Sequence, residues 1–167
     1  MIEARYTITF ADYLRLMFEI AYRRWTYIIV TLLGIIQLPI ILMMVVYPAL
    51  YNQNSVNSAF MLIFFALLMP ILLYFRSRAF YFGNTTFQNE IKVQFSKESI
   101  EFTDNKRTAR ISWDRIRKVV ETKDWVIFYQ TKYFFNFVPK SAFDSKDFSK
   151  LLSIIKDKLG AQAKLKS

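Results

Sequence analysis

The sequence predicts an α+β membrane protein in which a two-helix transmembrane hairpin is joined to an antiparallel β-barrel or sheet module, itself capped by a C-terminal helix. Three observations predict this class. Residues 25–75 contain no Asp, Glu, Lys or Arg, although 22% of the chain is charged. After residue 89, apolar and polar residues alternate with the period of a strand. After residue 143, the apolar spacing becomes helical.

The first region, residues 1–25, is predicted to form a short strand and an amphipathic interfacial helix. Alternation over residues 4–10 places Tyr6, Ile8 and Phe10 on one face of a half-buried strand. Asp12 offers an N-cap to the helix that follows. We expect the strand to pair with the sheet formed after residue 89.

The hairpin is predicted over residues 26–78, with spans at about 26–48 and 56–75. At about 1.5 Å per residue, each span reaches across a hydrocarbon core of about 30 Å. The uncharged loop between them is too short for anything except antiparallel neighbours. Pro39 and Pro70 are expected only to kink their helices, and Gln37 to bond the neighbouring helix.

Charge at the span ends predicts the orientation of the hairpin. Arg23 and Arg24 precede the first span, Arg76 and Arg78 follow the second, and the connecting loop contains no Lys or Arg. Positive charge accumulates on the cytoplasmic side of a membrane. A multi-pass protein with both termini in the cytoplasm is therefore predicted.

Residues 89–160 are predicted to fold as a cytoplasmic module of six or seven short strands and one helix. Asp144 or Ser145 caps the helix, and Gly160 ends it. A meander followed by one amphipathic helix fits a small open barrel, which is the order of elements in pleckstrin-homology (PH) domains. The tail, residues 161–167, is predicted to be flexible.

Three segments of this module carry a resemblance to a known family. They are residues 111–116 (ISWDRI), 119–122 (VVET) and 137–143 (FVPKSAF). Together with the N-terminal Phe10-Ala11-Asp12-Tyr13 step and the two-span hairpin, they resemble the YcxB-like family of bacterial membrane proteins. The resemblance implies a bacterial inner-membrane protein with a PH-like cytoplasmic domain. It supplies no activity and no functional residues.

The composition argues against an enzyme. The chain contains no Cys and no His, which excludes thiol nucleophiles, Cys or His metal sites and a Ser-His-Asp triad. Three glycines are too few for a phosphate-cradling loop. The close acidic pairs Glu98/Glu101 and Asp144/Asp147 are interpreted as solvated or capping residues. We therefore predict no catalytic residue, no metal and no cofactor.

Basic residues are the candidate binding groups. The net charge is +10, and residues 76–167 alone carry nineteen basic and ten acidic side chains. One cluster is proposed to bind lipid headgroups; its members are Lys106, Arg107, Arg110, Arg115, Arg117 and Lys118. The alternative is a solvated basic face that only orients the module toward an anionic leaflet. Nucleic acid is not expected, because a membrane anchor already holds the module against lipid.

An aromatic-dense strand follows, over residues 133–138. Alternation places Phe135 and Phe137 on one face, and Phe134 on the other, where it packs on the C-terminal helix or the membrane. An exposed aromatic patch would instead indicate a protein partner.

The function predicted from these features is a non-enzymatic, membrane-anchored PH-like binding module that binds anionic lipid headgroups or a protein partner. The alternative is an immunity or antitoxin protein that neutralises a toxin. A small transporter subunit is a third reading, against which the absence of ionisable residues in the spans argues. The sequence leaves the oligomeric state open.

Overall fold

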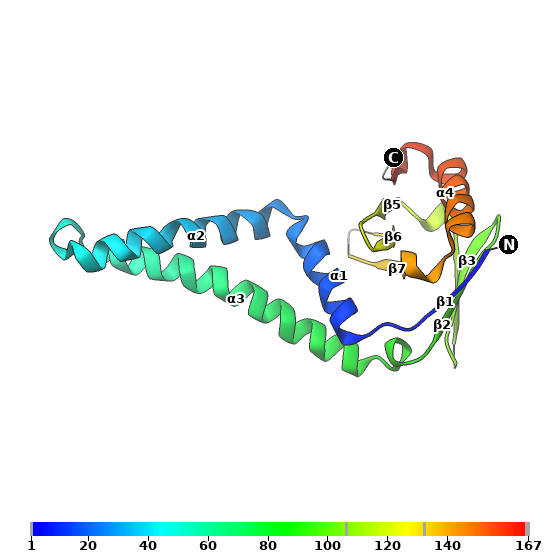
Figure 1. Ribbon diagram of the computed structural model, residues 1–167, viewed down its shortest axis with the longest axis horizontal. Helices are drawn as coiled ribbons and strands as arrows, with labels where there is room; N and C mark the ends of the chain where they lie inside the picture. The colour runs from blue at the N-terminus through cyan, green and yellow to red at the C-terminus, as the bar shows by residue number, and fades with distance from the viewer. Residues whose placement is uncertain (1, 106, 132, 166–167) are drawn as a thin grey trace. The chain divides into compact units, whose positions relative to one another are not determined.

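The computed structural model describes residues 2–105, 107–131 and 133–165. The chain forms two compact units (Figure 1). The β module comprises Met1–Ile8 and Asn84–Ser167, and the helical unit comprises Thr9–Gly83. The helical unit is thus an insertion, in sequence, within the β module.

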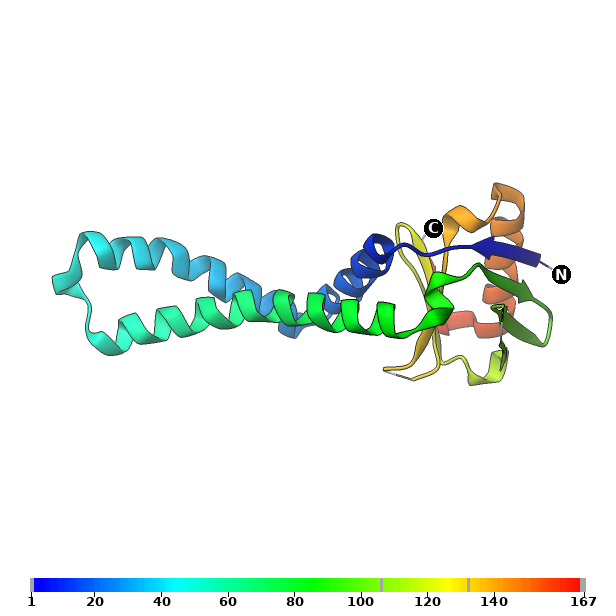
Figure 2. The ribbon, with the colours of Figure 1, turned by 90° about the horizontal axis from the view of Figure 1, so that it is seen from below.

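The helical unit contains α1 (Phe10–Tyr22), α2 (Trp25–Val46), the short 3-10 helix η1 (Pro48–Leu50) and α3 (Gln53–Gly83). Helices α2 and α3 lie side by side in both views (Figures 1 and 2) and are long and apolar enough to cross a membrane. They approach closely at Gly34, where an added Cβ would lie only 2.2 Å from the Cβ of Ala66. Their contact therefore depends on small residues, whereas the large apolar side chains point outward.

The first helix begins earlier than predicted. Thr9, not Asp12, is its N-cap: the Thr9 hydroxyl accepts the Asp12 backbone N–H at 3.2 Å and donates to the Asp12 carboxylate at 2.6 Å. The strand predicted over residues 4–10 is observed at Ile2–Tyr6. It cannot reach Phe10, because Phe10 is the first residue of the helix.

The third helix extends past the predicted end of the second span at residue 75 and reaches Gly83. Helix α1 packs along this extension. The ring of Phe10 lies 5.9 Å from that of Tyr74, 5.6 Å from Tyr81 and 5.5 Å from Phe82. These aromatic contacts explain why the helix continues where the apolar run stops.

The β module contains two four-stranded sheets. The first runs in the order β1 (Ile2–Tyr6), β2 (Ile91–Phe95), β3 (Ser99–Thr103), β4 (Thr108–Ser112). The second runs in the order β7 (Phe135–Pro139), β6 (Trp125–Tyr129), β5 (Lys118–Glu121), β8 (Ala163–Lys164). The 3-10 helices of the module are η2 (Thr85–Gln88), η3 (Trp113–Arg115), η4 (Lys140–Ala142) and η5 (Gly160–Gln162), and its one α-helix is α4 (Ser145–Leu159).

Strand β1 belongs to the β module, although the whole helical insertion separates it in sequence from its partner β2. It pairs antiparallel with β2, with Ile2 opposite Phe95 and Tyr6 opposite Ile91. The pairing expected for the N-terminal strand is therefore present. The buried Tyr6 hydroxyl also donates to the backbone carbonyl of Phe137 at 2.9 Å, which links the first sheet to the second.

The core lies between the two sheets and under α4. The rings of Phe95 and Phe128, both fully buried, are 5.9 Å apart and join the sheets. Helix α4 contacts β1 of one sheet and β5 of the other, and buries Leu151 and Ile155. The described residues form two four-stranded sheets and no closed barrel, so the sheet form of the prediction is confirmed, with β8 added as a parallel strand.

The end of the chain differs from the prediction of a flexible tail over residues 161–167. Gly160, at φ 49°, ends α4, and Ala163–Lys164 then form β8, which pairs in parallel with β5. The helix crossover supplies the length that a parallel connection requires. Residues 166–167 lie outside the described residues.

Candidate functional site

The predicted basic cluster begins on the β3–β4 hairpin. Lys106 lies outside the described residues. Arg107 is exposed, and its backbone N–H donates to the Asp104 carboxylate at 2.7 Å. The same carboxylate accepts the Thr86 hydroxyl at 2.8 Å. The hairpin turn is therefore organised around an acidic side chain.

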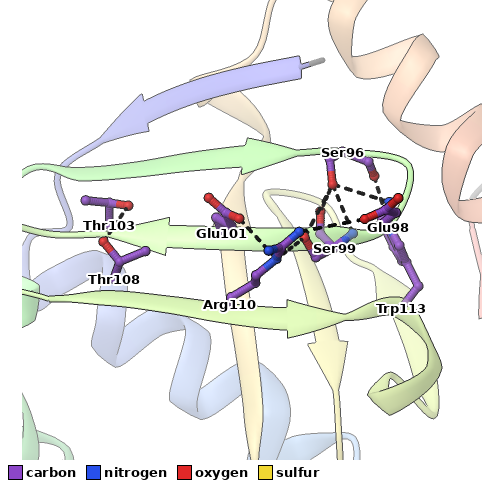
Figure 3. A network of polar contacts seen from close by, with 8 residues as sticks. All are labelled: Ser96, Glu98, Ser99, Glu101, Thr103, Thr108, Arg110 and Trp113. Atoms are coloured by element: carbon purple, nitrogen blue, oxygen red, sulfur yellow. Dashed lines mark hydrogen bonds and ion pairs between the residues drawn. The ribbon is translucent and has the colours of Figure 1, made fainter.

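Arg110 is held by acidic and hydroxyl groups of the neighbouring strand (Figure 3). Its Nε lies 3.1 Å from Oε1 of Glu101 and donates to the Ser99 hydroxyl at 2.8 Å. Its Nη2 lies 3.9 Å from Oε2 of Glu98. Two carboxylates thus lie beside one guanidinium, so an anionic ligand of Arg110 would have to compete with them.

The outer face of the first sheet continues this pattern. Register places Glu3, Gln94, Glu101 and Arg110 in one row across the four strands. The Glu3 carboxylate accepts from Gln94 at 3.0 Å and pairs with Lys92 at 3.1 Å. The hydrogen bond from Gln94, followed by that from Lys92, lowers the pKa of Glu3 to about 2. The face is a set of internal ion pairs rather than a free basic surface.

The other predicted cations, Arg115, Arg117 and Lys118, lie beyond the opposite end of β4. A strand rises about 3.4 Å per residue, so β4 separates them from the β3–β4 hairpin by roughly 17 Å. The sequence cluster is therefore divided into two groups.

This second group is exposed, and among the described residues no carboxylate lies within ion-pair distance of it. The nearest acidic neighbour in sequence is Asp114. The pKa of Asp114 is lowered mainly by a hydrogen bond from Ser112, with a smaller effect of Arg115.

Two exposed aromatic side chains project from the turn between β6 and β7. Tyr133 is 72% exposed and Phe134 is 59% exposed. The backbone N–H groups of both donate to the Thr131 hydroxyl, at 3.2 and 3.0 Å. The sequence placed Phe134 opposite Phe135 but did not show that it would remain uncovered.

The four arginines that flank the spans belong to the helical unit. Arg23 ends α1 and pairs with Glu19 at 3.7 Å, and Arg24 is the N-cap of α2. Arg76 and Arg78 lie inside α3, because the helix continues beyond the apolar run.

The sequence patterns do not predict one part-buried ion pair. Lys140 donates to the buried Glu121 carboxylate and lies 5.3 Å from the centre of the Phe148 ring. Glu121 and Lys140 come from two of the segments that carry the family resemblance. The pairing of β5 with β6, and of β6 with β7, brings Glu121 and Lys140 together. The alternation of apolar and polar residues within one strand could not predict this ion pair.

The described residues hold no group of three His, Cys, Asp or Glu side chains that could bind a metal ion. The acidic pair Asp144 and Asp147 lies at the start of α4, where the Asp144 carboxylate accepts the Asp147 backbone N–H at 2.6 Å. This is the capping role predicted for it.

Fold and site together define a two-sheet α+β module that carries an inserted pair of long apolar helices. Residues 95–155 match the family model described as YcxB-like protein. The match runs from the last residue of β2 into α4, and it confirms the family resemblance predicted from the sequence. Neither the curated proteins nor the solved structures gave a match.

Proposed function

We propose that this chain is a non-enzymatic, membrane-anchored PH-like module that acts at the cytoplasmic face of a bacterial inner membrane by binding anionic lipid headgroups. The observation that carries the proposal is the outward apolar surface of α2 and α3. Leu42 is 65% exposed and Phe64 is 59% exposed, in helices long enough to cross a bilayer. Water does not tolerate so large an apolar patch, whereas acyl chains do.

The sidedness of the proposal rests on the flanking charges. Cations flank the start of the first span and the end of the second; they are Arg23, Arg24, Arg76 and Arg78. The connection between α2 and α3 contains no Lys or Arg. Cytoplasmic loops accumulate Lys and Arg. Both connections from the helical unit to the β module then leave the membrane on the cytoplasmic side.

The proposed activity is binding, and two features support it. In the described residues, strands β2 to β7 precede the amphipathic helix α4, an order that resembles a PH domain apart from the added strand β8. Arg115, Arg117 and Lys118 are exposed cations. Near an anionic leaflet each such cation contributes about 1 kcal/mol of attraction. We propose no reaction, because a sequence without imidazole or thiol groups offers no evident nucleophile–base pair.

Sidedness can be tested with single cysteines, since the natural chain has none. Leu50→Cys marks the connection between the helices, and Lys97→Cys marks the β2–β3 turn. In intact spheroplasts, a membrane-impermeant maleimide should label Leu50→Cys and should label Lys97→Cys only after permeabilisation. Labelling of both sites without permeabilisation, or extraction of the chain by alkaline carbonate, would contradict the anchor.

A further inference from the structure

One end of the second sheet, named the sheet-end surface, consists of Arg115, Arg117, Lys118, Tyr133 and Phe134. We propose that this surface is the lipid-contact site of the module. Its two aromatic side chains enter the headgroup region of an anionic bilayer, and its three cations bind lipid phosphates. The inference rests on the proposed membrane anchoring and names the surface that performs the binding.

Strand register brings the two halves of the sheet-end surface together. Lys118 lies opposite Tyr129, and Tyr129 lies opposite Phe135, so the start of β5 and the β6–β7 turn share one end of the sheet. The Arg117 backbone N–H donates to the Tyr129 carbonyl at 2.8 Å, which extends this pairing to the arginine. Cations separated from the aromatics by about fifteen residues of sequence are therefore neighbours.

The aromatic tip is held in place by its own turn. Besides the two bonds to the Thr131 hydroxyl, the Phe134 carbonyl accepts the N–H groups of Gln130 at 3.0 Å and Thr131 at 3.2 Å. These bonds fix the backbone of Phe134 relative to Gln130 and Thr131. The exposure of Phe134 is a property of an organised element.

The two groups of predicted cations differ in their electrostatic surroundings. Arg110 faces Glu101 and Glu98, and the β3–β4 turn is built on Asp104. Among the described residues, no carboxylate lies within 4.0 Å of the sheet-end cations; the neighbouring Asp114, whose pKa Arg115 helps to lower, is a single acidic group beside three cations. An anionic surface is therefore attracted to the sheet end more strongly than to the hairpin.

The chemistry of the sheet-end surface fits a bilayer. A phenol and a phenyl ring beside cations match the depth profile of a membrane interface, where aromatic rings sit at the headgroup level. Guanidinium groups form paired hydrogen bonds with phosphate. Nucleic acid would also attract cations and rings, but a module tethered to a membrane anchor meets lipid at a far higher effective concentration.

The test measures the depth of single nitroxide labels on the full chain in nanodiscs. Tyr133→Cys reports the aromatic tip and retains Phe134; the exposed Lys123→Cys reports the opposite end of the same sheet. Discs contain either phosphatidylcholine alone or phosphatidylcholine with phosphatidylglycerol. In the anionic discs the label at 133 should become accessible to oxygen and protected from a water-soluble nickel complex, whereas the label at 123 should stay in water.

Charge and ring variants sharpen the test. Neutralisation of Arg115, Arg117 and Lys118 to Gln should lower the ratio of docked to undocked module about a hundredfold, because each cation contributes about 1 kcal/mol. Phe134→Ser should lower it about tenfold. Arg107→Gln, on the other hairpin, should leave the ratio within about a factor of three, and a loss as large as that of the triple variant would overturn the sheet-end site.

Two further labels separate this inference from the proposed function. Leu42→Cys should report acyl chains if α2 spans the bilayer, and Asn105→Cys reports the β3–β4 hairpin. A label at 133 that stays in water while the label at 105 enters lipid would overturn the sheet-end site and keep the proposed function. Protection of the label at 133 by added RNA or protein but not by anionic lipid would also overturn it. A label at 42 that remains in water would overturn the anchor itself.

Discussion

The helical unit and the β module use similar apolar residues in opposite ways. Phe64 in α3 is 59% exposed, whereas Phe128 in β6 is fully buried between the two sheets. Helices α2 and α3 touch through Gly34 and Ala66, whereas the sheets touch through large rings. The β module is stabilised by burying apolar surface away from water. The helical unit leaves its large apolar side chains exposed, which is what the proposed bilayer span requires.

Replacing one phenylalanine by alanine in each unit should therefore change the free energy of unfolding by different amounts. Phe128→Ala should lower the free energy of unfolding of the module by about 4 kcal/mol, through lost burial and a cavity. Phe64→Ala should cost less than about 1 kcal/mol in micelles, because its ring faces the surrounding apolar phase. Denaturant unfolding in micelles, followed by Trp fluorescence, measures both. Equal losses would break the contrast between the units.

The next largest effect should come from the part-buried pair of Glu121 and Lys140, of which the carboxylate is the buried member. Lys140→Met leaves Glu121 buried without its cation, and should lower the free energy of unfolding by about 3 kcal/mol. Adding Glu121→Leu to that variant should recover most of the loss, because no buried charge then remains. Urea titrations of the wild type, both single variants and the double variant give the coupling. A purely additive double variant would show that the pair does not interact.

The helical unit has its own sensitive point. Gly34→Ala should destabilise the α2–α3 contact by about 2 kcal/mol, because the new Cβ would meet that of Ala66. The compensating variant Gly34→Ala with Ala66→Gly moves the methyl group to the other helix and should restore most of the stability. Thermal unfolding in micelles compares the three proteins. Failure of Ala66→Gly to compensate would assign the cost to something other than this close approach.

The smallest effect should be a pH dependence of the β1–β2 pairing. The pKa of Glu3 falls from 4.5 to about 2 in the folded chain, so the folded state binds fewer protons than the unfolded state between these values. The contribution of Glu3 is present above about pH 4.5 and is lost as the pH falls toward 2. The protection factors of the β1 amides, which compare the exchange rate with the intrinsic rate at the same pH, should fall over that range in the wild type and lose this dependence in Glu3→Gln. An unchanged dependence in that variant would place the titration elsewhere.

Local patterns predicted the elements that a single strand or helix determines. Neighbouring residues are enough to predict three features. They are the buried face shared by Tyr6 and Ile8, the N-cap of α4 at Asp144 and its end at Gly160. The start of α1 was misread because Thr9 and Asp12 are both good capping residues, and only the backbone shows which one accepts the N–H. Strand β8 is two residues long, which is too short for any period to appear.

The candidate site could be predicted only in part, because register is not local. Arg110 and Glu98 are twelve positions apart, and a hairpin brings their side chains together. The six predicted cations looked like one cluster because residues 106–118 are adjacent in sequence. The five-residue strand β4, which contains Arg110, lies between the residues of the β3–β4 hairpin and Arg115, Arg117 and Lys118.

The pairing of β1 with β2 also orders events during synthesis. Ile2 leaves the ribosome long before Phe95, its partner, and both long helices are made in between. Chains fold as they emerge, N-terminal part first. The first strand must therefore wait, and the β module can close only after the whole helical insertion has been translated.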